Sequence, residues 1–290
     1  MSDVVGYGFV ESDFSHKCRL AMPRRIAKRS LKMSIDFNLN DEGIALITIN
    51  RPEVRNALDA EHYEALSEAW TRVRDDRAVR VAVITGAGDK AFCAGADLKS
   101  WVGRKVDPAS MWMTQKGQLL NRGLEVWKPV VAAVNGAAHG GGTTLLLATD
   151  LRVSVAEATF GLTEVKRGLV AGNGGTQRAI RQLPYCVAMK MLLCGATLSA
   201  AEAERWGLVN EVVPRDKLLE TAYTYARLAA ANAPLAVQAS KELAIRGTDM
   251  SLAEGLRMEQ FTNWQLQQTA DVQEGKLAFA EKRQPRFQGQ

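Results

Sequence analysis

The chain has 290 residues, 47% of them hydrophobic and 24% charged, a composition typical of a globular protein that can bury a large core. Its net charge of +5 suits an anionic ligand, but the charges are too few and too scattered to indicate nucleic-acid binding. No apolar run reaches the roughly 18 residues that a membrane-spanning helix needs, and the histidines, cysteines and carboxylates lack metal-ligand spacing. We therefore expect no membrane anchor, nucleic-acid partner or metal.

Residues 1–32 differ in character from the rest. They contain a basic stretch from Arg19 to Lys32 with little hydrophobic periodicity. Acidic residues in the same segment argue against a transit peptide, and no apolar run marks a secretion signal. We expect a poorly ordered leader, with the folded chain beginning at Met33. The four cysteines match no zinc or disulfide pattern, which favours a reducing, cytoplasmic location, and Cys93 is expected to be a small apolar residue.

After Met33 the hydrophobic pattern alternates between two periods. Short, continuously apolar runs predict buried strands at 44–49, 79–85, 130–134, 151–155 and 208–213. Helical periodicity predicts helices at 60–74, with Asp59 as the N-cap, at 109–126 and at 141–148. Strand and helix alternation of this kind indicates an α/β fold with a largely buried sheet.

The last third of the sequence is mainly helical. Ser199 and Glu202 have the spacing of a capping box, and helices are predicted at 217–231, 234–245 and 252–269. We therefore divide the chain into the leader (1–32), an α/β core (33–230) and a helical C-terminal region (231–290).

A glycine triplet is the clearest sign of a binding site. Gly140, Gly141 and Gly142 follow a buried strand and precede the apolar run at 145–148. Glycines at a helix start leave backbone N–H groups bare at the positive end of the helix dipole, where they can hold a negatively charged oxygen. By itself the triplet is equally compatible with a tight turn.

Other blocks accompany the triplet in a fixed order. RPEVRNAL occupies 51–58, AGADL occupies 94–98, and Phe160-Gly161-Leu162-Thr163-Glu164 follows the triplet. From about residue 33 to 290 the chain thereby resembles the crotonase (enoyl-CoA hydratase/isomerase) superfamily. The resemblance implies a core built as a spiral of ββα units and a C-terminal helical trimerisation region. It also implies an acyl-CoA thioester substrate, no cofactor beyond the coenzyme A of that substrate, and a homotrimer or dimer of trimers.

The resemblance assigns roles to the residues of these blocks. The N–H groups of Ala96 and Gly141 should form an oxyanion hole that stabilises a thioester enolate. Glu164 matches the second of two glutamates that hydratases of this family use to add water, and it should be the acid/base. Thr144 stands where the first glutamate is expected, and a threonine hydroxyl cannot act as a base at ordinary pH, although it can hold water.

One-glutamate chemistry is therefore better supported than two-glutamate hydration. Similar enzymes with a single glutamate include the Δ3,Δ2-enoyl-CoA isomerases and the hydroxycinnamoyl-CoA hydratase-lyases. A scaffold that binds acyl-CoA without catalysis is a further alternative. The acyl chain and the outcome of the reaction stay open at this stage.

The resemblance also implies where coenzyme A binds. Small and apolar groups should cradle adenine and pantetheine, while basic side chains meet the phosphates. The matching positions are Arg55, Ala57, Leu58, Ala94, Asp97 and Gly140, together with Phe279 and Lys282 of the C-terminal region, which should reach the ligand of a neighbouring subunit.

Overall fold

The structure is a computed structural model that describes residues 34–101 and 119–290. The predicted leader, residues 1–32, lies outside the described residues. Within the described ranges, no helix is both long and apolar enough to cross a membrane.

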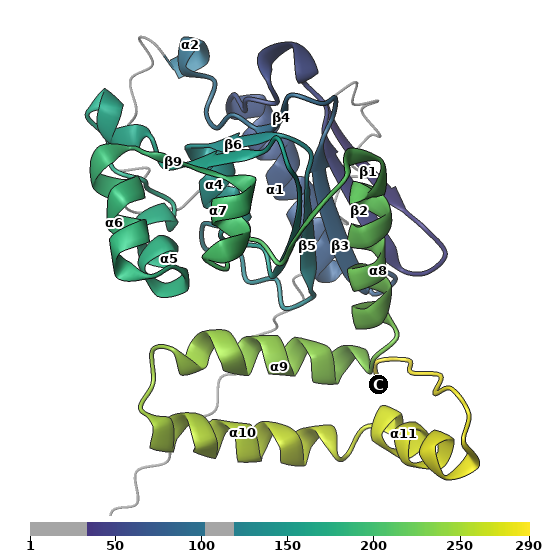
Figure 1. The fold of residues 1–290 in the computed structure, drawn as a ribbon. Helices are drawn as coiled ribbons and strands as arrows, with labels where there is room; N and C mark the ends of the chain where they lie inside the picture. The colour runs from purple at the N-terminus through teal and green to yellow at the C-terminus, as the bar shows by residue number, and fades with distance from the viewer. Residues whose placement is uncertain (1–33, 102–118) are drawn as a thin grey trace, which may run out of the picture. The chain divides into compact units, whose positions relative to one another are not determined.

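The larger of two sheets contains strands that follow one another in chain order (Figure 1). Its strands are β1 (Ile35–Leu39), β2 (Ile44–Ile49), β3 (Val81–Gly86), β5 (Val130–Val134), β7 (Leu151–Val155) and β10 (Glu211–Val213). β1 is antiparallel to β2, and every later pair is parallel. Every residue of β3 and β5 is buried, which explains why these strands are continuously apolar in sequence.

The smaller sheet consists of short strands. They are β4 (Ala91–Cys93), β6 (Ala137–His139), β8 (Thr159–Gly161) and β9 (Thr197–Ser199), in that order across the sheet. Each of the first three comes directly after a strand of the larger sheet: β4 follows β3, β6 follows β5 and β8 follows β7. The chain therefore alternates between the two sheets, and the turns between them bring distant segments together.

Helices pack on these sheets and connect them. α1 (Ala60–Asp75) begins at Asp59, whose side chain accepts the N–H of His62, and buries Leu66 and Trp70. α8 (Leu218–Ala230) lies along β3, β5 and β7 (Figure 1). The others are η1 (Pro52–Val54), α2 (Leu98–Trp101), α4 (Gly141–Leu146), η2 (Glu164–Arg167), α5 (Gly175–Gln182), α6 (Tyr185–Cys194), α7 (Ala200–Arg205) and η3 (Arg215–Lys217).

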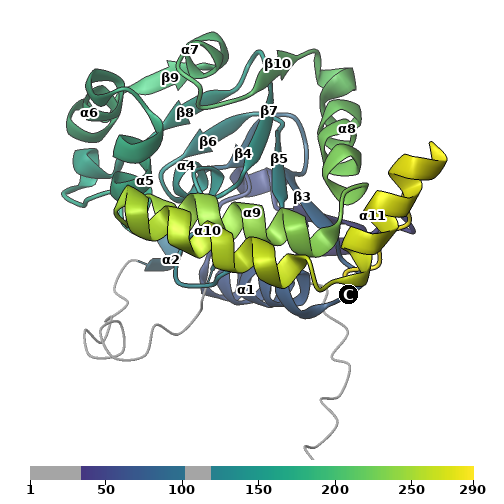
Figure 2. The same cartoon turned by 90° about the horizontal axis from the view of Figure 1, so that it is seen from below.

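The C-terminal region is an arrangement of long helices. α9 (Pro234–Gly247) and α10 (Leu252–Leu266) run side by side, and α11 (Ala270–Glu281) continues beyond them (Figures 1 and 2). Lys241 on α9 ties this region to the core, because its ammonium is 2.7 Å from the carboxylate of Asp150 and donates to the carbonyl of Lys128.

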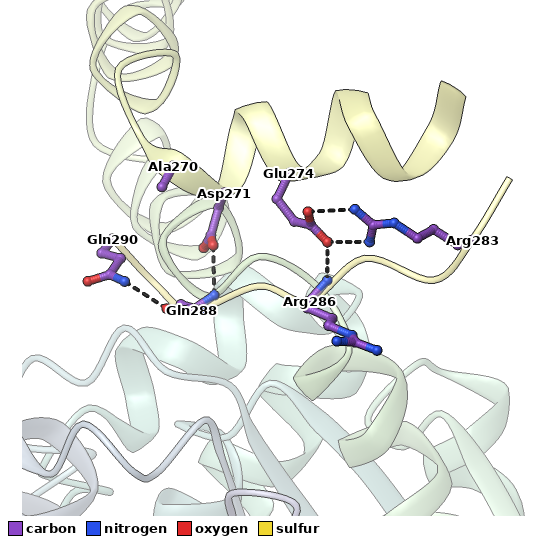
Figure 3. A pocket seen from close by; sticks show the side chains of 7 residues that line it. All are labelled: Ala270, Asp271, Glu274, Arg283, Arg286, Gln288 and Gln290. Atoms are coloured by element: carbon purple, nitrogen blue, oxygen red, sulfur yellow. Dashed lines mark hydrogen bonds and ion pairs between the residues drawn. The ribbon is translucent and has the colours of Figure 1, made fainter. Parts of the chain in front are cut away.

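The last residues fold back along α11 and border a pocket of about 550 Å³ (Figure 3). The buried carboxylate of Asp271 accepts the N–H groups of Gln288 and Gly289. Glu274 pairs with Arg283 through two contacts of 2.6 and 2.9 Å, which hold the pKa of the Glu274 carboxyl at about 2. These bonds fix the tail to the helix, which accounts for the polar lining of this pocket without a ligand.

Most of the longer predicted elements are confirmed. The strands at 44–49, 130–134 and 151–155, the Asp59 N-cap and the Ser199–Glu202 capping box occur as expected. The helix predicted at 109–126 is wrong from residue 119, while residues 109–118 lie outside the described residues. Leu119 instead pairs with Arg122 and Gly123 in a turn whose Gly123 has φ +78°, and the helix-like apolar spacing reflects leucines buried around that turn.

Candidate functional site

The first wall of the candidate site forms where two distant loops pair. The N–H of Leu58 donates to the carbonyl of Gly95 at 2.8 Å, and the N–H of Asp97 donates to the carbonyl of Leu58 at 2.9 Å. The N–H of Ala94 donates to the carbonyl of Arg55 at 3.1 Å. This short parallel ladder brings Arg55, Leu58, Ala94 and Asp97 of the predicted coenzyme A set together, with Ala57 and Ala96 beside them.

Buried Asn56 holds this wall in place. Its side-chain oxygen accepts the N–H of Arg51, and its amide donates to the carbonyls of Ala87 and Ala91. Arg51 in turn donates to the carbonyl of Ala57 and lies 3.3 Å from the carboxylate of Asp59. Because each bond fixes backbone, the loop at 51–58 is pinned to the turn between β3 and β4.

The glycine triplet packs against this wall. A Cβ placed on Gly95 would lie 2.9 Å from the nitrogen of Gly141, and a Cβ placed on Gly141 would lie 3.7 Å from the nitrogen of Ala96. Gly95 also has φ +91°, a conformation that favours glycine. The two amides predicted to form the oxyanion hole therefore lie near each other, and this close approach requires glycine at position 95.

Gly142 allows the backbone of α4 to approach β4 closely. A Cβ on Gly142 would lie 1.9 Å from the carbonyl oxygen of Cys93, so no other residue fits there. Cys93 itself is fully buried; its sulfur accepts the N–H of Gly95, and burial raises the pKa of the thiol to about 11. The thiol therefore stays protonated at ordinary pH and is not a nucleophile.

Glu164 adjoins the first glycine of the triplet and is the first residue of η2. Its Oε1 would be 3.6 Å from a Cβ on Gly140, and its Oε2 is buried with no hydrogen-bond partner among the described residues. Burial raises the pKa of its carboxyl, against the lowering effects of its own backbone N–H and of the Arg167 cation. An unpartnered carboxyl oxygen of this kind is costly unless a ligand or water completes its bonding.

Thr144 is also placed near the triplet, since its N–H donates to the carbonyl of Gly140 at 3.0 Å. Its hydroxyl is buried, lacks a partner in the described part of the chain, and faces Gly175, where an added Cβ would lie 2.7 Å away. The first turn of α5 therefore limits the space around this hydroxyl.

A phenol that sequence reasoning missed lies among these groups. The hydroxyl of Tyr63, on α1, would be 3.1 Å from a Cβ on Gly141. Burial, and to a smaller degree the negative charge of Glu164, raises the pKa of the Tyr63 phenol, so the phenol stays neutral. The sequence signal was weak, because Tyr63 lies on the inward stripe of α1 with Leu66 and Trp70 and reads as a core residue.

Two predicted residues lie apart from this cluster within the single chain. Phe279 is 88% exposed on α11, and Lys282 caps the same helix with φ 54°. α11 is separated from β4 and α4 in both views (Figures 1 and 2). Their predicted contact with the ligand of a neighbouring subunit stays a prediction. In the described ranges, no three His, Cys, Asp or Glu side chains group as metal ligands would.

The sequence of this chain is similar to those of known acyl-CoA enzymes. Residues 40–290 match the family model described as enoyl-CoA hydratase/isomerase. The chain is 46% identical over 250 residues to (E)-benzylidenesuccinyl-CoA hydratase of Thauera aromatica, an alignment that covers 85% of this chain and 96% of that protein. It is 41% identical over 262 residues to carnitinyl-CoA dehydratase of Salmonella arizonae, covering 89% and 100% of the two chains.

Solved structures of enoyl-CoA hydratases have the same fold as this chain. The crystal structure of an enoyl-CoA hydratase from Bacillus anthracis superposes with a TM-score of 0.80 at 36% identity. The superposition covers 89% of this chain and all of that one, so the two-sheet core and the C-terminal helices are both part of the shared fold.

Proposed function

Because the chain belongs to the enoyl-CoA hydratase/isomerase family and is an enzyme of that family, we propose that it adds water reversibly to the C2–C3 double bond of an acyl-CoA thioester. The fold predicted from the sequence, a crotonase-type α/β core, is confirmed by the neighbouring structures. The two relatives described above are named for water addition and water removal on CoA thioesters, which supports this direction of chemistry.

One observation carries the proposal. Glu164 adjoins Gly140 through its Oε1, while its Oε2 is buried with no partner among the described residues, and the nitrogen of Ala96, on the loop after β4, lies beside Gly141. Gly141 is the first residue of α4, so its N–H has no acceptor within the helix. A carboxyl group and two backbone N–H groups therefore lie around the consecutive residues Gly140 and Gly141.

The proposed reaction uses these groups in two steps. The Glu164 carboxylate takes a proton from water as the water oxygen bonds to C3, and the C2–C3 π electrons move toward the thioester oxygen. The N–H groups of Ala96 and Gly141 stabilise the negative charge on that oxygen. The enolate then collapses and takes the same proton from Glu164 at C2, which restores the carboxylate.

Thr144 should hold the attacking water in this scheme. Its hydroxyl can accept and donate one hydrogen bond each without changing charge, and no described residue uses either bond. Thr144 can orient the water, but unlike a second carboxylate it cannot also take a proton from it. We therefore expect slow hydration of crotonyl-CoA compared with two-glutamate hydratases.

Isomerisation is the second candidate, and a specific observation favours it. Within the described residues, Glu164 is the one carboxylate with a buried oxygen that lacks a partner. Moving a double bond from C3–C4 to C2–C3 needs a single base, which removes a proton from C2 and returns it at C4, with the same oxyanion stabilisation.

Turnover by Glu164→Gln tests the function, because this change keeps the shape of the side chain and removes the base. Purified variant and parent would be assayed on crotonyl-CoA, (E)-benzylidenesuccinyl-CoA, carnitinyl-CoA and a 3-enoyl-CoA. We expect turnover of the best substrate to fall about 100-fold or more, while binding of a saturated acyl-CoA, measured by calorimetry, is retained.

The matched control is Glu61→Gln, which alters an exposed carboxylate on α1 and should leave turnover unchanged. Activity on the 3-enoyl-CoA alone would favour isomerisation over hydration. Unchanged turnover in Glu164→Gln would remove Glu164 from the mechanism and overturn the proposal.

A further inference from the structure

We propose that Tyr63 is a catalytic residue whose phenol O–H donates a hydrogen bond to the thioester oxygen, as a third donor beside the N–H groups of Ala96 and Gly141. The inference rests on the proposed function and deepens it, because it adds a side chain to a site otherwise built from backbone.

The position of the hydroxyl supports this role. The space into which a Cβ of Gly141 would project is bounded by three groups: the hydroxyl of Tyr63 at 3.1 Å, the Cα of Gly95 at 3.4 Å and the nitrogen of Ala96 at 3.7 Å. The phenol oxygen therefore borders the same small space as the two amide donors, although it comes from α1 and they come from the β4 and β6 turns.

The bonding of the hydroxyl supports it as well. Tyr63 packs against the hydrophobic core, and a phenylalanine would serve that packing equally. Tyr63 is partly buried, and its hydroxyl forms no hydrogen bond to another side chain or backbone group within the described part of the chain, so it can bond a ligand. The partner is then expected to come from the ligand.

The charge state of the phenol is compatible with donation. Burial and the neighbouring negative charge of Glu164 raise its pKa, so it keeps its proton throughout the working pH range. A neutral phenol next to developing negative charge acts as a donor and is unsuited to be a base. Glu164 thus carries the proton, and Tyr63 stabilises the oxygen.

Tyr63→Phe tests the inference, with Tyr223→Phe as the matched control, since Tyr223 is a similarly half-buried tyrosine on α8. Charge develops on the thioester oxygen in the transition state, so we expect Tyr63→Phe to lower kcat about 10- to 100-fold, with KM changed less than about threefold. The melting temperature and the acid limb of the pH profile should stay as in the parent protein.

Absorption of bound cinnamoyl-CoA gives a readout that does not depend on turnover. Donors on the thioester oxygen polarise the conjugated chain and shift its absorption to longer wavelength. The shift would be measured in Glu164→Gln, in which we expect turnover to be at least about 100-fold slower, and again after adding Tyr63→Phe. We expect the added substitution to reduce the shift while cinnamoyl-CoA remains bound.

Failure of this inference can be distinguished from failure of the proposed function. A full shift and unchanged kcat in Tyr63→Phe would overturn the inference, while loss of turnover in Glu164→Gln would still uphold the proposed function. A rise in KM alone would show that Tyr63 serves only packing. A displaced acid limb would show that Tyr63 acts through the pKa of Glu164. Either result would also overturn the inference.

Discussion

Glu164 is held in an environment that opposes its own charge. Partial burial favours the protonated carboxyl, while its backbone N–H and the guanidinium of Arg167 favour the carboxylate. Burial is the largest of these effects, so the net direction is upward from the 4.5 of an ordinary glutamate. An upward shift of this pKa suits the proposed role of Glu164, which requires the carboxyl both to take and to return a proton.

The pH dependence of hydration should report this upward shift. The carboxylate form starts the reaction, so kcat/KM should fall as the pH drops through the raised pKa, with a midpoint above 4.5. Arg167→Ala removes a cation that lowers this pKa and should move the midpoint to still higher pH. Arg181→Ala, on exposed Arg181, is the control. A midpoint at or below 4.5, or one that Arg167→Ala moves downward, would contradict the assignment.

Thr144→Val should lower activity without lowering stability. Valine keeps the shape of threonine but removes a buried hydroxyl that lacks a partner, so the free energy of unfolding should stay level or rise by about 1 kcal/mol. Turnover should fall, because the attacking water loses a positioning bond. Thermal unfolding and steady-state kinetics would check both. A stabilised variant with full activity would place Thr144 outside the mechanism.

At the scale of elements, the site depends on how closely α4 approaches β4. Gly142 has no space for a side chain against the carbonyl of Cys93, and this contact sets the position of the neighbouring Gly141 nitrogen beside Ala96. The proposed oxyanion hole therefore depends on the packing between α4 and β4, and a change in that packing should alter turnover.

Gly142→Ala tests this dependence. Its Cβ would lie 1.9 Å from the Cys93 carbonyl oxygen, so α4 must shift, at a cost of about 1–3 kcal/mol in the free energy of unfolding. The displaced Gly141 N–H should lower kcat at least about 10-fold, because donor geometry is critical. Gly247→Ala, at an open helical position, should change neither quantity by much. Unimpaired kcat in Gly142→Ala would show that Gly141 is not a donor.

Many of the longer elements could be predicted from the sequence, because five or more residues can reveal a period, although β1 and α6 were not predicted. The strands of the smaller sheet have three residues each, too few to show one, and all four were missed. The helix predicted at 252–269 ends at Leu266, and Thr269 then caps the separate helix α11, since its hydroxyl accepts the N–H of Val272. Capping by threonine inside an otherwise helical pattern was not recognised.

From the chemistry of the residues alone, glycines gave the clearest sign of the candidate site, whereas Glu164 and Thr144 were assigned through the family resemblance. Gly95, Gly141 and Gly142 signal close backbone approach, and the structure brings their strands together. Tyr63 could not be found in this way, because its hydroxyl reaches the site only once α1 packs beside the β4 and β6 turns. The unpartnered oxygens of Glu164 and Thr144 likewise depend on burial, which a linear sequence does not display.

At the scale of the molecule, the C-terminal helices leave large apolar side chains uncovered. Leu252 is 79%, Trp264 66% and Phe279 88% exposed, and Phe261 is exposed on the same helix as Trp264. Large apolar side chains exposed on two successive helices are costly in water and typical of an interface. The predicted trimeric assembly would cover it.

Light scattering should therefore return three or six times the 31.7 kDa of one chain at micromolar concentration. Replacing Phe261 by Ser and Trp264 by Gln removes apolar area from the predicted interface and should shift the equilibrium toward smaller species. Tyr185→Ser, an exposed aromatic on α6 of the core, is the control. A monomer mass for the unmodified protein would rule the assembly out.

The strand order has a consequence for how the molecule is assembled in time. In both sheets the spatial order of the strands equals their order along the chain. Each new strand can therefore add to an edge that already exists, and none has to insert between two strands that are already paired. The fold can grow in one direction during synthesis, alternating between its two sheets. Until β10 pairs with β7, however, each stage exposes an apolar edge that could pair with another unfinished chain.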